Sequence, residues 1–273
     1  MKASIGIDIG GSTTKAAGRN ETGELIGTLQ VTADDPRTCT YGILGRFLQQ
    51  HNLSLSDVSQ ITLTGLGSTF FHEDIYGIPT RHMDELTSIA RGGLYLSGLS
   101  EALIISMGTG TAFIRASKAD GFRHLGGSGI GGGTLTGLAS HFFHQNNIFT
   151  LSDMAMKGSR AMADLRIGDL VDEDVPSLNS ELTAANFGKI KSGATENDMA
   201  AALFNMIYEN IGVMAVFALQ GDTIRDVVLT GSLACLPPAE VTFSVFNRMK
   251  DVFGVNFIQP PHAAFATAIG SLL

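Results

Sequence analysis

The feature that most constrains this chain is a glycine- and threonine-rich turn that occurs twice, each time after an apolar run. The first turn lies within residues 5–15 and the second within residues 103–111. Each segment reads as a strand, a tight turn and a second strand. Glycine lets backbone N–H groups approach phosphate oxygens, and hydroxyl groups add further donors. The two hairpins therefore predict a nucleotide held between two similar halves of the chain.

A second repeat supports this division. The segment Ile-Thr-Leu-Thr-Gly at 61–65 is answered by Val-Val-Leu-Thr-Gly at 227–231. One glycine-rich turn after a strand is more often an ordinary hairpin than a phosphate site. Two such turns, each followed later by a strand ending in Leu-Thr-Gly, indicate a duplicated topology. We therefore expect two lobes, each with a sheet that begins with one hairpin, and a nucleotide cleft between them.

Composition excludes two classes of partner. The chain has 273 residues, a net charge of −8 and no block of Lys or Arg, so a nucleic acid is not expected. The most apolar long stretch, 199–219, contains Asn205, Glu209 and Asn210. We interpret it as a buried helix and expect no membrane span.

The two cysteines are typical of a protein in a reducing compartment. Cys39 and Cys235 lie far apart and have no metal-type spacing, which favours reduced, buried thiols in the cytoplasm. The N-terminal residues run directly into a strand, which predicts no signal peptide.

Strands alternate with helices along the chain, so the class is α/β with mixed sheets. Asp84 is a good N-cap for a helix that follows it. The stretch 159–186 is polar and irregular. Strands are expected near 3–31, 60–65, 102–106, 226–231 and 255–258, and helices near 41–50, 196–220, 239–253 and 262–272. A further helix is expected after Asp84, carrying Leu86, Ile89 and Ala90, and 134–138 has helical character.

The densest glycine tract, 126–133, precedes a segment of helical character that begins at Thr134. A helix N-terminus after glycines is a ready anion site. The alternative is a flexible linker, but linkers are rarely followed at once by an amphipathic helix. We favour the anion site.

Phosphoryl transfer needs phosphate cradles, a metal site and a carboxylate that takes the proton of the attacking hydroxyl. Asp8 is the candidate for Mg²⁺, directly or through water. Lys15 either contacts phosphate or lies on the outer face of its strand, and Ser232 either approaches the adenosine or belongs to a turn. The expected ATP-binding residues are Asp8, Gly10, Gly11, Ser12, Thr13, Thr14, Lys15, Gly108, Thr109, Gly110, Gly131, Gly132, Gly133, Thr134, Leu135, Thr136, Ile148 and Ser232.

These motifs resemble those of the superfamily that includes acetate kinase, sugar kinases, heat-shock chaperones and actin. Within it, the chain resembles type II pantothenate kinases over essentially its whole length. The similarity covers both phosphate loops, and it is most specific in the glycine signature 126–138 and in Leu-Thr-Ala-Ala-Asn-Phe-Gly at 182–188. The resemblance implies a two-lobed actin-like ATPase fold built from duplicated ribonuclease-H-like domains, with lobes at 1–100 and 101–273.

It also implies ATP and Mg²⁺ as cofactors, pantothenate as the acceptor, and a homodimer. A family glutamate after an Ile-Pro loop acts as the general base, and that spacing leads to Glu85. From spacing alone, Asp84 and Glu85 would rather cap the helix and balance its dipole. Arg123 and His124 are the candidates for binding the acceptor carboxylate, because family members place an arginine where this chain has His124.

Glu181 is a second departure, because it stands where the family has aspartate. The acceptor therefore stays open, as do feedback by coenzyme A thioesters and the oligomeric state. A sugar or amino-sugar kinase of the same fold is one alternative, although the cysteine-rich zinc motif of repressor-related sugar kinases is missing. A nucleotide-gated ATPase module without an acceptor is the other.

Overall fold

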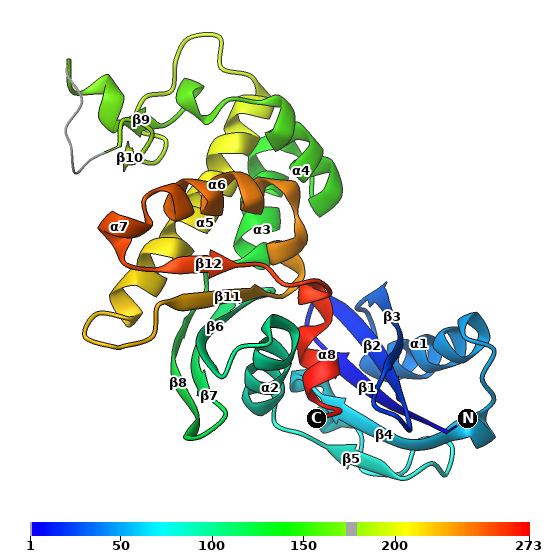
Figure 1. Ribbon diagram of the computed structural model, residues 1–273. Coiled ribbons are helices and arrows are strands. Elements are labelled where there is room, and N and C mark those ends of the chain that lie inside the picture. The colour runs from blue at the N-terminus through cyan, green and yellow to red at the C-terminus, as the bar shows by residue number, and fades with distance from the viewer. Residues whose placement is uncertain (1, 173–178) are drawn as a thin grey trace.

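The computed structural model describes residues 2–172 and 179–273, which form two five-stranded mixed sheets (Figure 1). The first has the order β3-β2-β1-β4-β5 and the second β8-β7-β6-β11-β12, which is the same topology twice. The strands of the first sheet are β1 Ala3–Ile9, β2 Thr13–Asn20, β3 Leu25–Thr32, β4 Val58–Thr64 and β5 Thr80–His82. Those of the second are β6 Glu101–Met107, β7 Thr111–Ser117, β8 Gly121–Ser128, β11 Asp226–Thr230 and β12 Asn256–Ile258.

The duplication extends to the turn after each Leu-Thr-Gly strand. Gly65 and Gly231 have φ values of +83° and +89°, which glycine adopts without strain. Each begins a short 3₁₀ helix, η2 (Leu66–Phe70) or η5 (Ser232–Cys235). A Cβ on Gly65 would lie 2.7 Å from the Ile9 carbonyl oxygen, and one on Gly231 would lie 2.4 Å from the Met107 carbonyl oxygen. Both turns thus pack against the strand end that leads into a phosphate loop.

Helices form layers around the sheets (Figure 1). Helix α1 covers the outer face of the first sheet, where Phe47 packs with Ile5 and Ile7. Helices α3, α5 and α6 cover the outer face of the second sheet, and α4 packs on α5. The α-helices are α1 Pro36–Gln50, α2 Glu85–Ser97, α3 Gly132–Phe143, α4 Ile148–Lys157, α5 Glu196–Ala218, α6 Pro237–Arg248, α7 Lys250–Phe253 and α8 Ala266–Gly270.

Helices α2 and α8 lie between the two sheets (Figure 1). Ile89 and Leu94 of α2 pack on the second sheet, whereas Ala268 of α8 packs on Ala17 of the first. A Cβ on Gly92 would lie 1.9 Å from the Ala266 carbonyl oxygen, so the two helix backbones touch. The two lobes therefore share a layer of two helices. The division of the chain into lobes at 1–100 and 101–273 stays a prediction.

Several expected boundaries differ from the structure. Helix α1 begins at Pro36 rather than at 41, because Asp35 caps it by accepting from the Thr38 amide. The helix expected at 239–253 is interrupted at Met249, and the C-terminal helix is a 3₁₀ turn followed by α8. The irregular stretch 159–186 contains the short strands β9 (Leu165–Arg166) and β10 (Thr183–Ala185), although 173–178 lies outside the described residues.

Helix α5 is long and apolar enough to cross a membrane by composition, but so are core helices, and more than half of its apolar window is buried. Tyr208 and Ile211 on this helix are completely buried in the core of the second lobe. The prediction of a buried helix is confirmed. The prediction of buried cysteines is wrong, because Cys39 is half-buried and Cys235, in the turn after β11, is exposed.

Candidate active site

The two phosphate loops touch each other. The Ser12 hydroxyl lies 2.8 Å from the Thr109 hydroxyl, although the residues are 97 positions apart in sequence. Each loop is the hairpin turn between the first two strands of its sheet, so the duplicated topology brings the two turns to one place. The two loops are therefore close enough for one nucleotide to contact both, as the sequence predicted.

The loop tips present free backbone donors. Within the described part of the chain, the Gly11 and Ser12 amides have no hydrogen-bond partner, and neither have the Thr109 and Gly110 amides. The Gly10 amide is already used, since it donates to the Thr13 carbonyl. Free backbone N–H groups on two turns in contact can together bind an anion.

The glycine tract supports the second loop rather than serving as a linker. The Gly132 amide donates to the Gly108 carbonyl at 2.8 Å, and the Gly133 amide donates to the Thr109 carbonyl at 2.9 Å. A Cβ on Gly131 would lie 2.6 Å from the Thr109 carbonyl oxygen. These amides are therefore occupied, and the expected anion site at the start of α3 does not include them.

The hydroxyls that follow the tract are also engaged. Thr134 donates its hydroxyl to the Gly129 carbonyl, and Thr136 donates to the Gly132 carbonyl. Leu135 is completely buried. The side chains of Thr134, Leu135 and Thr136 therefore stabilise the start of α3. None of the three has a side-chain group free to bind a nucleotide.

Asp8 and Lys15 are opposite each other in the β1–β2 pair, and both are more than nine-tenths buried. The alternative that Lys15 lies on an outer face is wrong. Burial raises the pKa of Asp8 to about 6, although Lys15 opposes that shift. Burial also lowers the pKa of Lys15, while Asp8, Cys235 and Glu85 act in the other direction. Among the described residues Lys15 has no ion pair, so its charge is available to an anionic ligand.

Glu85 is the first residue of α2 and lies within electrostatic range of Asp8 and Lys15. Burial raises its pKa, and Asp84 raises it further. Asp84 is the N-cap: its carboxylate accepts from the Thr87 amide at 2.8 Å and from the Thr87 hydroxyl at 2.9 Å. The cap is therefore confirmed as Asp84, and the capping alternative for Glu85 is removed.

A buried contact fixes α2 to the first lobe near this site. The hydroxyl of Thr64, at the end of β4, lies 3.1 Å from that of Ser88 on α2. Gly65 follows Thr64, and a Cβ there would lie 2.7 Å from Asp8 Oδ1. The sequence repeat identified this Leu-Thr-Gly segment. It did not predict that the segment would contact both Asp8 and α2.

The two acceptor candidates lie on opposite faces of the edge strand β8. Arg123 is opposite Arg115, whose guanidinium pairs with Asp222 beyond the end of α5. His124 is opposite Ile114, which packs with α2. Residues directly opposite in an antiparallel pair share one face. His124 therefore lies on the face against which α2 packs, whereas Arg123 lies on the opposite face.

The remaining predicted residues are more scattered. Thr14 is completely buried, so its side chain cannot contact a ligand, whereas Thr13 is half-buried at the start of β2. Ile148 begins α4 and packs partly against the core of the second lobe. Ser232 begins η5, whose last residue, Cys235, is within electrostatic range of Lys15. Sequence reasoning did not place Cys235 at the site, because no local pattern marks it.

A divalent cation fits the carboxylates that are present. The described residues contain no cluster of three or more His, Cys, Asp or Glu side chains able to hold a metal by themselves. Asp8 is a buried carboxylate beside the phosphate loops, and Mg²⁺ is usually held by one or two carboxylates, waters and substrate phosphates. The site thus suits a cation that arrives with a nucleotide.

Comparison with known proteins gives the family. A sequence profile of the family named Fumble matches residues 101–273, which is more than half of the chain. The chain belongs to the Fumble family. It is 28% identical to a type II pantothenate kinase of Oceanobacillus iheyensis, over 98% of both chains. It is 25% identical to a type II pantothenate kinase of Staphylococcus aureus strain USA300, again over 98% of both. The family resemblance is confirmed.

Solved structures give the fold. The activator of 2-hydroxyisocaproyl-CoA dehydratase from Clostridium difficile, with bound ADPNP, superposes with a TM-score of 0.70 at 14% identity, over 98% of this chain and 92% of that one. Component A of the Acidaminococcus fermentans (R)-2-hydroxyglutaryl-CoA dehydratase gives 0.69 at 16% identity, over 99% and 96%. The predicted α/β class with an actin-like ATPase fold is confirmed.

Proposed function

We propose that this protein transfers the γ-phosphoryl group of ATP to the primary hydroxyl of pantothenate, the first step toward coenzyme A. The observation that supports phosphoryl transfer is the meeting of two phosphate loops beside Asp8, Lys15 and Glu85. The acceptor is inferred from relatives that are named type II pantothenate kinases and match over 98% of both chains.

The loops bind and orient the triphosphate. Their four free amides donate to phosphate oxygens, and Lys15 supplies positive charge where negative charge develops during transfer. Because burial lowers the pKa of Lys15, an anionic ligand beside it also stabilises its protonated form. Lys15 thus binds the nucleotide in its charged state.

Glu85 acts on the acceptor. Burial raises the pKa of Glu85, and a carboxylate with a raised pKa is a stronger base than an exposed one. As the acceptor oxygen bonds to the γ-phosphorus, the hydroxyl proton passes to Glu85 and the bond to the β-phosphate oxygen breaks. ADP leaves with the electron pair of that bond.

Asp8 holds Mg²⁺, directly or through water, and the cation neutralises phosphate charge when bound. His124 contacts the acceptor carboxylate, because it shares a sheet face with α2, which begins at Glu85. A neutral imidazole donates one hydrogen bond, which suits a carboxylate less well than the family arginine would. The proposal also includes a homodimer in the cytoplasm, which follows from the family resemblance.

The test is acceptor-dependent release of ADP. Purified protein with Mg²⁺ and ATP is assayed with pantothenate, pantetheine, glucose and N-acetylglucosamine, and the phosphorylated product is identified by mass spectrometry. Pantothenate should raise ADP release at least tenfold over the rate without acceptor. Stimulation by a sugar alone would make the chain a sugar kinase. ADP release that no acceptor stimulates would indicate a nucleotide-gated ATPase.

A further inference from the structure

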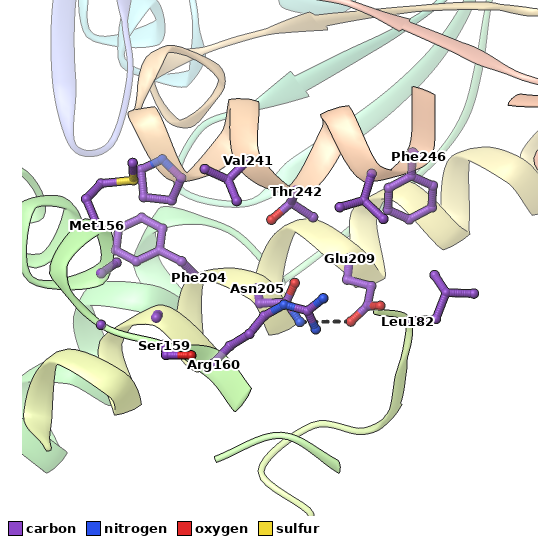
Figure 2. Close-up of a pocket in the computed structure, with 15 residues that line it drawn as sticks. Met156, Ser159, Arg160, Leu182, Phe204, Asn205, Glu209, Val241, Thr242 and Phe246 are labelled. Carbon is purple, nitrogen blue, oxygen red and sulfur yellow. Dashed lines mark hydrogen bonds between the residues drawn. The ribbon is translucent and has the colours of Figure 1, made fainter. Parts of the chain in front are cut away.

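The second lobe contains a cavity of about 270 Å³ between α4, α5 and α6 (Figure 2). None of its lining residues belongs to the predicted nucleotide or acceptor sites. Its volume is close to the lower limit for small-molecule sites. Much of the wall is apolar, and the larger apolar side chains are Met156, Leu182, Phe204, Val241, Val245 and Phe246.

Asn205, on α5, places an unpartnered acceptor at this cavity. The side chain is 6% exposed, and its Nδ2 lies 2.9 Å from a Glu209 oxygen and 3.1 Å from an Asp164 oxygen. Two carboxylates beside one end of the amide identify that end as the donor. The other end is therefore the carbonyl oxygen, and within 2–172 and 179–273 it accepts no hydrogen bond.

Thr242, on α6, places a second unpartnered group there. The residue is 7% exposed and lines the cavity. Figure 2 shows its side chain extending from α6 toward α5, where Asn205 lies. A helical threonine commonly bonds a carbonyl one turn back. Here the hydroxyl has no partner among the residues that the structure describes, so it can both donate to and accept from a ligand.

The charged groups of the cavity are already engaged. Arg160 donates to the Thr183 hydroxyl at 2.9 Å and to the Glu181 carbonyl. Glu209 accepts from the Thr183 amide at 3.2 Å and from Asn205. An anion would lie beside the Glu209 carboxylate, and the one cation of the wall, Arg160, already lies 3.9 Å from Asp164, so burying an anion here is unfavourable. The cavity therefore favours a neutral ligand over an anionic one.

We propose that this cavity is a second ligand site, which binds a small uncharged molecule with an apolar body and an amide or hydroxyl group. The apolar body packs between Phe204, Val241 and Phe246. The polar group donates to the Asn205 carbonyl oxygen and exchanges a hydrogen bond with the Thr242 hydroxyl. Ligands of this class satisfy both buried groups, and neither a hydrocarbon nor an anion does so.

Three probes of similar shape test the required chemistry: benzamide, benzoate and ethylbenzene. The full chain is labelled with ¹³C in its Met, Leu and Val methyl groups, and methyl spectra are recorded during titration. Benzamide should shift the methyl signals of Met156, Leu182, Val241 and Val245 in a saturable manner. Benzoate and ethylbenzene should bind at least fivefold more weakly, since each lacks the N–H donor.

Two variants test the location. Thr242→Val keeps the shape but removes the hydroxyl, and should weaken benzamide binding about 2- to 13-fold, the equivalent of one net hydrogen bond. Ala201→Met fills the cavity from α5 and should abolish binding. Thr223→Val, at an exposed threonine between α5 and β11, is the matched control and should bind as the parent does.

Circular dichroism and thermal unfolding establish that each variant is folded. If benzamide does not shift the cavity methyl signals in the parent protein, the cavity holds only water and the proposal is wrong. It is equally wrong if benzoate binds as tightly as benzamide, or if folded Thr242→Val and Ala201→Met bind benzamide like the parent. The readout does not depend on the acceptor, so failure of the kinase proposal would leave this test unaffected.

Discussion

At the residue scale, two neighbouring carboxylates of the candidate site have different surroundings. Asp84 is engaged as the N-cap of α2, whereas Glu85 has no cap contact and a raised pKa. Glu85→Gln keeps the shape but removes the base, so kcat should fall about 10²- to 10⁴-fold, with ATP affinity and Tm nearly unchanged. Asp84→Asn should keep most activity, because Asn is also a good cap. Steady-state kinetics that show the opposite ranking would exchange the two assignments.

Asp8 illustrates a conflict between stability and function. Its pKa rises from 3.8 to about 6 in the folded protein, so the folded state holds this proton more tightly than the unfolded chain does. The unfolding free energy contributed by Asp8 therefore falls as pH rises from about 4 to 6. At 1.36 kcal/mol per pKa unit, the cost at neutral pH is about 3 kcal/mol.

Asp8→Asn should remove this cost. In EDTA, urea unfolding should show the variant more stable than the parent by up to about 3 kcal/mol above pH 6, with the difference vanishing below pH 4. Turnover with Mg²⁺ and ATP should fall strongly at the same time. A variant with parental turnover would remove Asp8 from the mechanism, and a pH-independent stability difference would contradict its raised pKa.

His124 and Arg123 are distinguished by the face of β8 on which they lie. His124→Ala should raise the KM for the acceptor about tenfold, because it removes the donor on the α2 face, and should leave the KM for ATP unchanged. Arg123→Ala, on the opposite face, serves as the neighbouring control and should change acceptor KM less than twofold. Initial rates at varied acceptor concentration give both values. The reverse result would place the acceptor on the opposite face of the sheet.

At the element scale, the glycine tract shapes the second phosphate loop. A Cβ at Gly131 would lie 2.6 Å from the Thr109 carbonyl oxygen, so Gly131→Ala should displace the loop and weaken ATP binding at least tenfold in calorimetry. Gly137, later in α3, has no atom within 4 Å of an added Cβ. Gly137→Ala is the matched control and should bind ATP normally while stabilising the helix by about 0.5–1 kcal/mol. Normal ATP affinity in Gly131→Ala would show that the loop does not depend on this contact.

At the scale of the whole molecule, α2 and α8 connect the two lobes. Gly92 of α2 touches the α8 backbone, so Gly92→Ala should force the helices apart and lower the unfolding free energy by about 1–3 kcal/mol. Turnover should fall as well, because α2 begins at Glu85. Gly45→Ala on α1, where an added Cβ meets nothing within 4 Å, should not destabilise the protein. Thermal unfolding followed by circular dichroism compares the two, and equal Tm values would contradict the close packing.

The duplication, the two glycine-rich hairpin turns, the cap at Asp84 and the α/β class were predictable from the sequence. Each of these depends on local features: turn chemistry, strand hydrophobicity and the residue before a helix. The repeated Leu-Thr-Gly segments also indicated that the halves would match, and the two sheets have the same strand order. The whole-chain resemblance indicated the family that the comparisons confirmed.

Features that depend on long-range packing could not be predicted from the sequence. The tertiary structure buried Lys15 beside Asp8, and it used the Gly132 and Gly133 amides to support the second loop. It also decided which face of β8 carries His124 and which carries Arg123, because that depends on the register of β8 against β7. The physical reason is that burial, and with it the pKa of Asp8 and Lys15, depends on segments far apart in the chain, whereas turns and caps are determined by their immediate neighbours.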